Sequence, residues 1–322
     1  MFSRIKTIFW WNLSKESKEV KEKIKNSSVI CIGNFDGVHA GHQKVIKVGK
    51  EIAESKKSKL CILTFLPHPR FIFRPEDFFI LTPIKEKIKR IEKLGVDYIL
   101  ILNFFQVKDM SPYDFCLFLK DKIAPCGISV GADFSFGKDA KGKPEDLKKF
   151  FSNFGVDVKI VPLLFSDDEK KISSSFLRNL IKEGKVWEFK NYTGSFYSVK
   201  GCVVKGEGRG KSLGFPTANI STTYFLPQDG VYACFVKLDS LGFFKGVCNV
   251  GPKPTFGSSG KFLEVFILDF EGNIYLRSIE IFFVKKIRDV FKFSSAEELK
   301  EKIKKDVQIA QQILSQITLT EI

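Results

Sequence analysis

Apolar residues in the first half of the chain alternate between two kinds of spacing, and this pattern predicts alternating strands and helices. Residues 29–32 form a continuous apolar run, which is typical of a strand buried on both faces. Apolar residues then recur at helical spacing through 45–53, and a second apolar run fills 59–65. The segment 27–65 is therefore predicted to form a strand, a turn, a helix and a second strand.

The same alternation continues to about residue 164. Thr82 and Pro83 are expected to be the cap and the first residue of one helix, and Ser111 with Asp114 has capping-box spacing at the start of another. Alternating strands and helices favour a parallel sheet with right-handed crossovers, whose ligand crevice lies at the carboxyl ends of the strands. The helices are expected at 82–95, 111–123 and 144–154, and the strands at 97–102, 128–132 and 156–164.

Beyond residue 184 this alternation stops. Residues 185–196 are expected to be a connector, and from Tyr197 onward the apolar runs are short, strand-like and separated by Gly, Pro, Asn and Asp. Such a pattern favours a small antiparallel barrel. One helix is predicted to end it, starting at a capping box of Ser295 and Glu298.

Length and cysteine content place these elements in a broader class. A chain of 322 residues, 44% of them hydrophobic, can bury more than one core, so we expect two domains, 1–184 and 185–322. The seven cysteines include no Cys-x-x-Cys pair and lie mostly in apolar runs, which indicates reduced thiols and a cytoplasmic protein. The apolar run near the start is broken by Asn12 and is too short to span a membrane, so we expect neither export nor a membrane partner.

The net charge of +15 comes mostly from lysine, since only 8 of the 52 basic residues are arginine. The lysines are scattered along predicted helices, which is typical of solvated helix faces. A basic nucleic-acid-binding protein that uses the aromatic residues of the barrel stays open as an alternative, although we expect no nucleic-acid partner. Small anionic substrates fit the same charge.

The segment "GNFDGVHAGH" (33–42) lies between the first predicted strand and the first predicted helix, where the ligand crevice is expected. A helix N-terminus offers free N–H groups, glycines such as Gly33 and Gly41 let a phosphate approach the backbone, and imidazoles donate hydrogen bonds to phosphate oxygens. His39 and His42 are therefore predicted to face a polyphosphate. The alternative is a polar turn whose histidines only cap the helix; a zinc site is disfavoured, because this half offers no further ligand set.

The segment "ISSSFLR" shows the same chemistry at another predicted helix start. Ser173 and Ser174 lie at that start, and Arg178 follows about one turn later. Hydroxyl groups and a guanidinium group in this position can hold a phosphate. An ordinary serine cap is the alternative.

Two features of the second half suggest phosphate binding and a catalytic carboxylate. In the loop 206–220, glycines allow a close backbone approach to phosphate, and Thr217 and Asn219 offer oxygen ligands of the kind that magnesium accepts, although a long hairpin loop is the alternative. Glu264 is the only acid in the apolar run 262–268. A carboxylate is costly to bury without partners, so Glu264 is our candidate for a general base, with a solvent-facing edge position as the alternative.

Taken in order, "GNFDGVHAGHQ", "LTFLPHP", "LTPIKEK", "GADFSFG" and "ISSSFLR" resemble the adenylyltransferase half of the bifunctional bacterial riboflavin kinase/FMN adenylyltransferases. The segments "GFPTAN", "GVYA", "NVGPKPTF", "LEVFILDF" and "FSSAEEL" resemble the kinase half of the same family. The chain departs from this pattern at "YTGS" (192–195), where the family often has Leu-Gly-Arg, at Lys211, where arginine is common, and at Leu66, where many members have an acid.

The resemblance implies an α/β plus β fold: a Rossmann-like nucleotidyltransferase domain with a parallel sheet, then a six-stranded antiparallel barrel with a C-terminal helix. It implies that riboflavin and ATP give FMN in the barrel, that FMN and ATP give FAD and pyrophosphate in the first domain, and that Mg²⁺ takes part. Another nucleotidyltransferase fused to an unrelated barrel is a second alternative, which the kinase motifs disfavour.

The resemblance also implies roles for single residues. It favours Glu264, His39 and His42 as catalytic residues. In the first domain, the residues expected to bind ATP or phosphate are Gly33, Phe35, Asp36, Gly41, Asp133, Ser173, Ser174 and Arg178. In the second domain, those expected to bind ATP or flavin are Gly210, Lys211, Gly214, Pro216, Thr217, Asn249 and Arg288, with Thr217 and Asn219 as metal ligands.

Overall fold

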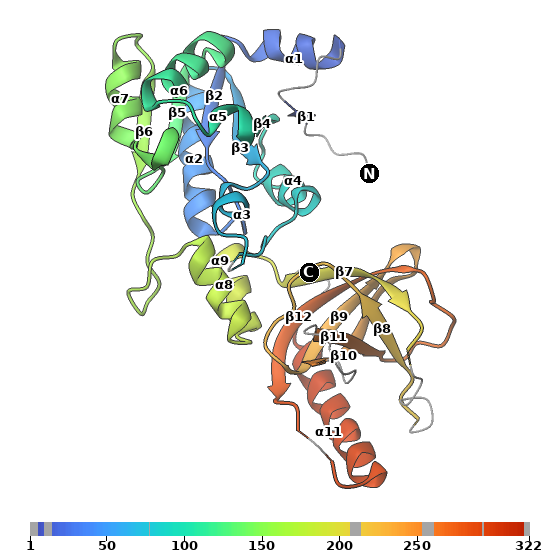
Figure 1. Cartoon of the computed structure of the whole chain (residues 1–322). Helices are drawn as coiled ribbons and strands as arrows, with labels where there is room; N and C mark the ends of the chain where they lie inside the picture. The colour runs from blue at the N-terminus through green and yellow to red at the C-terminus, as the bar shows by residue number, and fades with distance from the viewer. Residues whose placement is uncertain are drawn as a thin grey trace. The chain divides into compact units, whose positions relative to one another are not determined.

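The computed structural model describes residues 6–9, 15–76, 78–206, 214–252, 261–291 and 293–318. The chain forms two compact units, Met1–Ser174 and Ser175–Ile322. The first unit combines a sheet with helices, and the second is a closed barrel with helices (Figure 1). The fold class expected from the sequence, α/β followed by an antiparallel barrel, is confirmed.

A six-stranded parallel sheet forms the centre of the first unit, in the order β1-β4-β3-β2-β5-β6. The strands are β1 (Lys6–Phe9), β2 (Ser28–Ile32), β3 (Lys59–Leu66), β4 (Tyr98–Asn103), β5 (Gly127–Gly131) and β6 (Asp157–Val161). The strand order reverses at β2, which pairs with β3 on one side and with β5 on the other. In a doubly wound sheet the ligand crevice lies at the carboxyl end of this reversal point.

Helices cover both faces of this sheet, because alternate strand residues point to opposite faces. On one face Ile30 and Leu63 pack with residues of α1, α6 and α7. On the other face Cys31 and Ile62 pack with residues of α2 and α4 (Figure 1). The helices of this unit are α1 (Lys15–Ile24), α2 (Ala40–Ser55), α3 (Pro69–Phe73), α4 (Ile84–Glu92), α5 (Phe104–Val107), α6 (Pro112–Phe118) and α7 (Pro144–Ser152).

The segment that we expected to be a plain connector contains a helix. α8 (Ser174–Lys182) is followed by α9 (Val186–Thr193), and Gly184 lies between them with φ +73°. α9 buries Val186, Phe189 and Thr193, which share one helix face. The expectation of a connector is wrong because the aromatic residues of α9 lie on several faces, so the sequence shows little helical periodicity.

Six antiparallel strands close into a barrel in the second unit, in the order β10-β11-β8-β7-β12-β9. Tyr197, Tyr232 and Phe283 are fully buried and their rings pack against one another. Side chains therefore fill the barrel, as expected for so few strands. The strands are β7 (Tyr197–Val204), β8 (Thr217–Ser221), β9 (Gly230–Leu238), β10 (Gly242–Pro252), β11 (Lys261–Ile267) and β12 (Ser278–Arg288).

The last helix, α11 (Ala296–Ser315), packs against the barrel (Figure 1). Ala310 and Leu314 on this helix join Ala233 and Phe235 of β9 in one buried cluster. Its N-cap is Ser295, whose hydroxyl accepts a hydrogen bond from the backbone N–H of Glu298, as the sequence predicted. In the described part of the chain, no helix has the length and apolar character needed to cross a membrane.

Candidate functional site

The loop 33–42 leaves the carboxyl end of β2 and leads into α2. Its backbone turns sharply, since Phe35, Gly37 and Val38 have φ values of +49°, +89° and +46°. Residues other than glycine adopt such φ values rarely. Burial of the Phe35 and Val38 side chains holds the turn in place. The turn makes His39 the N-cap of α2 and places His42 in the first turn of that helix.

The two histidines form a stacked pair at this helix N-terminus. Their ring centroids lie 3.7 Å apart, and the Phe35 ring lies 5.2 Å from that of His42. The Nδ1 atom of His39 accepts a hydrogen bond from the backbone N–H of His42 at 3.4 Å. A neutral His39 therefore carries its proton on Nε2, from which it can donate to a ligand.

Both imidazoles are held in their neutral form. Burial lowers the pKa of His39 to about 4, although the charges of Asp133 and Asp36 oppose the change. Burial also lowers the pKa of His42 well below its ordinary value, and the neighbouring His39 and Lys87 lower it further. Near pH 7 the pair offers hydrogen-bond donors to an anionic ligand without adding positive charge.

Asp36, a residue of this loop, fastens the loop to the segment before α4. Its fully buried carboxylate accepts hydrogen bonds from the backbone N–H groups of Leu81 and Thr82, at 3.1 and 3.0 Å, and from the Thr82 hydroxyl at 3.2 Å. The N–H of Gly37 donates to that same hydroxyl oxygen at 2.8 Å. Thr82 thus forms hydrogen bonds to the loop instead of capping α4. The prediction of Thr82 as the cap is wrong, because Pro83 is the N-cap of α4.

Three further candidates of the first unit, Gly41, Asp133 and Ser174, lie in or near the same loop. Gly41 lies close to the carbonyl of Ile172, and a Cβ atom there would come within 3.2 Å of the His39 ring. The Ser174 hydroxyl donates to the carbonyl of Asp36 at 2.8 Å, which brings the "ISSS" segment to the loop. Asp133 pairs with Lys171 at 2.5 Å. Gly33 follows the last residue of β2, Ser173 precedes α8, and Arg178 is buried on α8 within the second unit.

Sequence reasoning missed three groups that act on the histidine pair, one of which is Lys171, the partner of Asp133. His68 caps α3, where its Nδ1 accepts from the N–H of Arg70 at 3.1 Å, and its charge would lower the pKa of His42. Its only signal was its place in "LTFLPHP". Lys87 is buried on α4 and looks in the sequence like any lysine of a charged helix.

In the second unit, three polar residues lie in one row across neighbouring strands. Glu264 of β11 pairs in register with Asn219 of β8 on one side and with Asn249 of β10 on the other. Residues that face each other across an antiparallel pair point to the same side of the sheet. All three are half-buried, whereas Leu263 and Val265, on either side of Glu264, are buried inside the barrel.

This row provides oxygen atoms suited to a hard cation and its ligands. Thr217 lies two residues before Asn219 and so shares its face. The Oδ1 atom of Asn249 is buried, and in the described chain it has no hydrogen-bond partner. Groups of three or more His, Cys, Asp or Glu side chains that could hold a metal are absent from the described residues. The oxygen atoms of Thr217 and Asn219 are of the kind that magnesium accepts when it also takes oxygens from a bound phosphate.

Four further kinase candidates lie near this row in the sequence. Gly214 and Pro216 are exposed just before β8, and Gly214 has φ +86° with open space around it. Gly210 and Lys211 lie outside the described residues.

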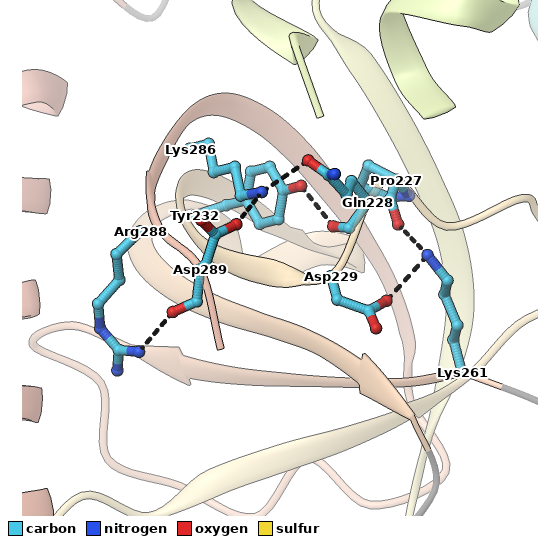
Figure 2. A network of polar contacts seen from close by, with 8 residues as sticks. All are labelled: Pro227, Gln228, Asp229, Tyr232, Lys261, Lys286, Arg288 and Asp289. Carbon is cyan, nitrogen blue, oxygen red and sulfur yellow. Dashed lines mark hydrogen bonds and ion pairs between the residues drawn. The ribbon is translucent and has the colours of Figure 1, made fainter. Parts of the chain in front are cut away.

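Arg288, by contrast, makes its contacts within the protein. Its Nε and one terminal nitrogen donate to the carboxylate of Asp306 on α11 at 3.0 and 2.8 Å. Its other terminal nitrogen donates to the carbonyl of Asp289 (Figure 2). The structure thus places the Arg288 guanidinium in the junction between β12 and α11.

Figure 2 also shows how the turn 227–229 is fixed to the barrel. The hydroxyl of Tyr232 donates to the carbonyl of Gln228, whose side-chain oxygen accepts from the Nζ of Lys286 at 2.7 Å. On the other side of the turn, Lys261 pairs with Asp229 at 2.9 Å. These contacts join β9, β11 and β12 at one end of the barrel.

Comparisons with known proteins cover nearly the whole chain. A family model described as FAD synthetase matches residues 21–176, and one described as riboflavin kinase matches residues 193–314. A Bacillus subtilis protein named bifunctional riboflavin kinase/FMN adenylyltransferase is 37% identical over 305 residues, which cover 90% of this chain and 93% of that protein. The Escherichia coli (strain K12) protein of the same name is 32% identical over 285 residues, covering 86% of this chain and 90% of that one.

A solved structure supports the same fold over both units. A protein from Streptococcus pneumoniae, described as a macrolide-efflux protein, has a TM-score of 0.82 and 29% sequence identity with this chain. The match covers 90% of this chain and 96% of the other. The efflux description applies to that protein alone.

Proposed function

The chain belongs to the bifunctional riboflavin kinase/FMN adenylyltransferase family, and from this premise we propose which of its residues carry out the two reactions. The enzyme phosphorylates riboflavin to FMN with ATP. It also transfers an adenylyl group from ATP to FMN, which gives FAD and pyrophosphate. The family match supports this function over the two alternatives left open by the sequence, a nucleic-acid-binding protein and an unrelated nucleotidyltransferase fusion.

In adenylyl transfer, a phosphate oxygen of FMN forms a bond to the α-phosphorus of ATP, and the bond to the departing pyrophosphate breaks. The FMN phosphate is already an anion, so the step needs no general base. It needs alignment of the two phosphates and stabilisation of negative charge on the transferred group. We assign this stabilisation to His39 and His42, supported above all by their neutral, stacked arrangement at the N-terminus of α2.

The remaining candidates of the first site have supporting roles in this proposal. Gly33 and Gly41 allow phosphate to approach the backbone. Phe35 and Asp36 set the shape of the loop, through the packing of one ring and the hydrogen bonds of one carboxylate. The residues proposed to contact ATP or phosphate are Asp133, Ser173, Ser174 and Arg178.

In the kinase reaction, a ribityl hydroxyl of riboflavin attacks the terminal phosphorus of ATP, and ADP departs. The hydroxyl proton must be removed as the new bond forms. We assign this role to Glu264, because it is the carboxylate in the half-buried row between Asn219 and Asn249. In the same proposal Asn249, Gly210, Lys211, Gly214, Pro216 and Arg288 bind nucleotide or flavin. The Arg288 guanidinium also pairs with Asp306 of α11.

Thr217 and Asn219 are proposed to hold Mg²⁺ together with the phosphates of ATP. When bound, the ion would offset the negative charge of those phosphates. We further propose that the enzyme works in the cytoplasm on small-molecule substrates, without a nucleic-acid or membrane partner. Its proposed functional division is 1–184 for adenylyl transfer and 185–322 for the kinase.

Incubation of the full chain with riboflavin, ATP and Mg²⁺, followed by separation of the flavins over time, tests the proposed function. We expect FMN to appear first and FAD to follow. A second sample with a chelator in place of Mg²⁺ tests the metal, and it is expected to form neither product. Accumulation of FMN alone would contradict the role of the first unit, and unchanged riboflavin would contradict the whole proposal.

A further inference from the structure

Lys87 is a buried lysine on α4 whose ammonium group contacts the loop 33–42. Only 6% of the residue is exposed, whereas Lys85 and Lys89 on the same helix are exposed. Its Nζ atom donates a hydrogen bond to the carbonyl of Asn34 at 2.7 Å. In the part of the chain that the structure describes, Lys87 forms no ion pair with a carboxylate. A buried cation without a paired anion is costly, so it requires an explanation.

The contact of Lys87 is one of several that join the start of α4 to the loop. Asp36 accepts hydrogen bonds from Leu81 and Thr82, and Gly37 donates to Thr82. Lys87 adds a third point of attachment at Asn34, two residues before Asp36. The segment 81–87 therefore binds the loop at Asn34, Asp36 and Gly37, all of which precede the two histidines in the chain.

The surroundings of His42 disfavour its protonation. The Nδ1 atom of His42 is buried and, in the described chain, has no hydrogen-bond partner. Protonation of His42 would place an N–H group at this position with nothing to receive it, in a region that already holds the Lys87 ammonium group. A charged His42 would also face the ring of His39 at 3.7 Å.

We propose that Lys87 is a positioning residue for adenylyl transfer: its ammonium group holds the loop through Asn34 and disfavours a second positive charge in this buried region, so that the stacked histidine pair persists in moderately acidic solution. The proposal rests on the proposed function of the first unit. It assigns to Lys87 no contact with substrate.

The charges around the pair agree in direction with this role. Burial is the main cause of the lowered pKa of His42, and the Lys87 charge lowers it further. The pKa of Lys87 is itself lowered by burial, while the charge of Asp36 opposes that change. The titratable groups that act on the two histidines, one on the other included, are His39, His68, Lys87, Asp36, Asp133 and Lys171.

Four variants of the full chain separate the charge of Lys87 from its hydrogen bond. Lys87→Met removes both, Lys87→Gln removes the charge but keeps a donor, and Lys87→Arg keeps the charge. Lys89→Met is the matched control, because Lys89 is exposed on the same helix and, among the described residues, its ion pair is with Glu86. For each variant, kcat/KM for FAD formation from FMN is measured between pH 4 and 9, and riboflavin phosphorylation in the same preparation reports whether the other unit is intact.

A second measurement reads the histidines directly. The chain has only three histidines, so their imidazole Cε1–H signals can be followed by NMR during a pH titration and assigned with single His→Gln variants. In Lys87→Met and Lys87→Gln we expect the His42 titration and the acidic limb of kcat/KM to move to higher pH by about one unit. Lys87→Arg and Lys89→Met should leave both where they are in the parent protein.

The proposal is overturned if folded Lys87→Gln and Lys87→Met keep the parent His42 titration and the parent acidic limb. It is also overturned if FAD formation falls equally at every pH, since that result would indicate a purely structural role. If Lys87→Met fails to fold, Lys87→Gln decides the question. Failure of the proposed function gives a different result, because the parent protein would then form no FAD while the titration could still be read.

Discussion

At the scale of single residues, Glu264 differs in one property from the asparagines beside it. Asn219 and Asn249 occupy neighbouring register positions, but only Glu264 can accept a proton near neutral pH. Glu264→Gln keeps the size of the side chain and removes its basicity. We therefore expect FMN formation to slow about a hundredfold or more, a loss of the size associated with general-base catalysis.

The same preparation of Glu264→Gln provides its own control. FAD formation from supplied FMN is expected to continue at the parent rate, because Glu264 is not among the residues proposed for that reaction. FMN formation at the parent rate would remove Glu264 from the mechanism. Loss of both activities would indicate misfolding.

His39 predicts how the stability of the first unit depends on pH. Its pKa is about 4 in the folded protein, mainly because of burial, against an ordinary value of 6.5. Between these values the unfolded chain binds a proton that the folded chain does not, so the free energy of unfolding falls as the pH is lowered from 6.5 to 4. The contribution of His39 to this loss is about 3 kcal/mol at most.

Denaturant unfolding of the full chain at several pH values checks this expectation. His39→Gln removes the titrating group, so its free energy of unfolding should change less between pH 6.5 and 4 than that of the parent. The transition of the first unit can be followed by loss of FAD-forming activity in the parent protein and by circular dichroism in the variant. Equal slopes for the two proteins would count against the lowered pKa.

The residues that position the histidines show where sequence reasoning stops. The spacing of glycine and histidine in 33–42 predicts a phosphate-facing turn, because the signal is local. The attachment of Asp36 to Thr82, and of Lys87 to Asn34, joins residues about 50 positions apart in the chain. Nothing in either segment alone indicates its partner. The contacts between the α4 region and the loop can therefore be found only from the structure.

At the scale of elements, one ion pair holds α11 to the barrel. The Asp306 side chain is only 3% exposed and the Arg288 side chain 15% exposed. The guanidinium also lies over the ring of Phe291, 4.6 Å from its centroid. Asp306→Asn would leave a largely buried guanidinium without its anion, so we expect the second unit to lose about 3–5 kcal/mol of stability.

Glu301→Gln on the same helix is the matched control for Asp306→Asn. Glu301 pairs with Lys304 in an exposed position, where solvent screens the pair, so its loss should change stability far less than Asp306→Asn does. Thermal inactivation of the kinase activity, compared with that of FAD formation in the same sample, measures the effect on each unit. Equal inactivation temperatures for Asp306→Asn and the parent would show that the pair contributes little.

Elements with a strong periodic pattern were predicted from the sequence, and short or mixed ones were not. The parallel strands other than β1 follow from apolar runs, and α2 follows from a clear helical spacing. β8 lies in the glycine-rich loop 206–220 and has one buried residue among its five, so its pairing with β7 and β11 cannot be seen locally. α9 is similar, because its burial depends on its contacts with the barrel.

At the scale of the whole molecule, the two reactions use separate sets of residues, and this predicts complementation between chains. His42→Ala removes one donor to the transferred group, which should slow FAD formation about a hundredfold while FMN formation continues. Glu264→Gln has the opposite defect. A mixture of the two chains is therefore expected to convert riboflavin to FAD, although neither chain does so efficiently alone.

Flavin separation over time, with each variant alone and with the mixture, measures this outcome. FMN should accumulate in the His42→Ala sample and disappear when Glu264→Gln is added. A mixture that forms no more FAD than the separate samples, while each variant keeps its remaining activity, would contradict passage of FMN between chains through solution.

The short strand β1 affects the tendency of the first unit to aggregate. β1 contributes only four residues, yet they pair with β4 and cover its outer side. Without them, β4 would present a row of unpaired backbone N–H and C=O groups next to its apolar residues, which is the arrangement that recruits strands from neighbouring molecules. These four residues thus protect the edge of β4 from pairing with other chains. A shortened chain that lacks them would be prone to self-association even with both active sites intact.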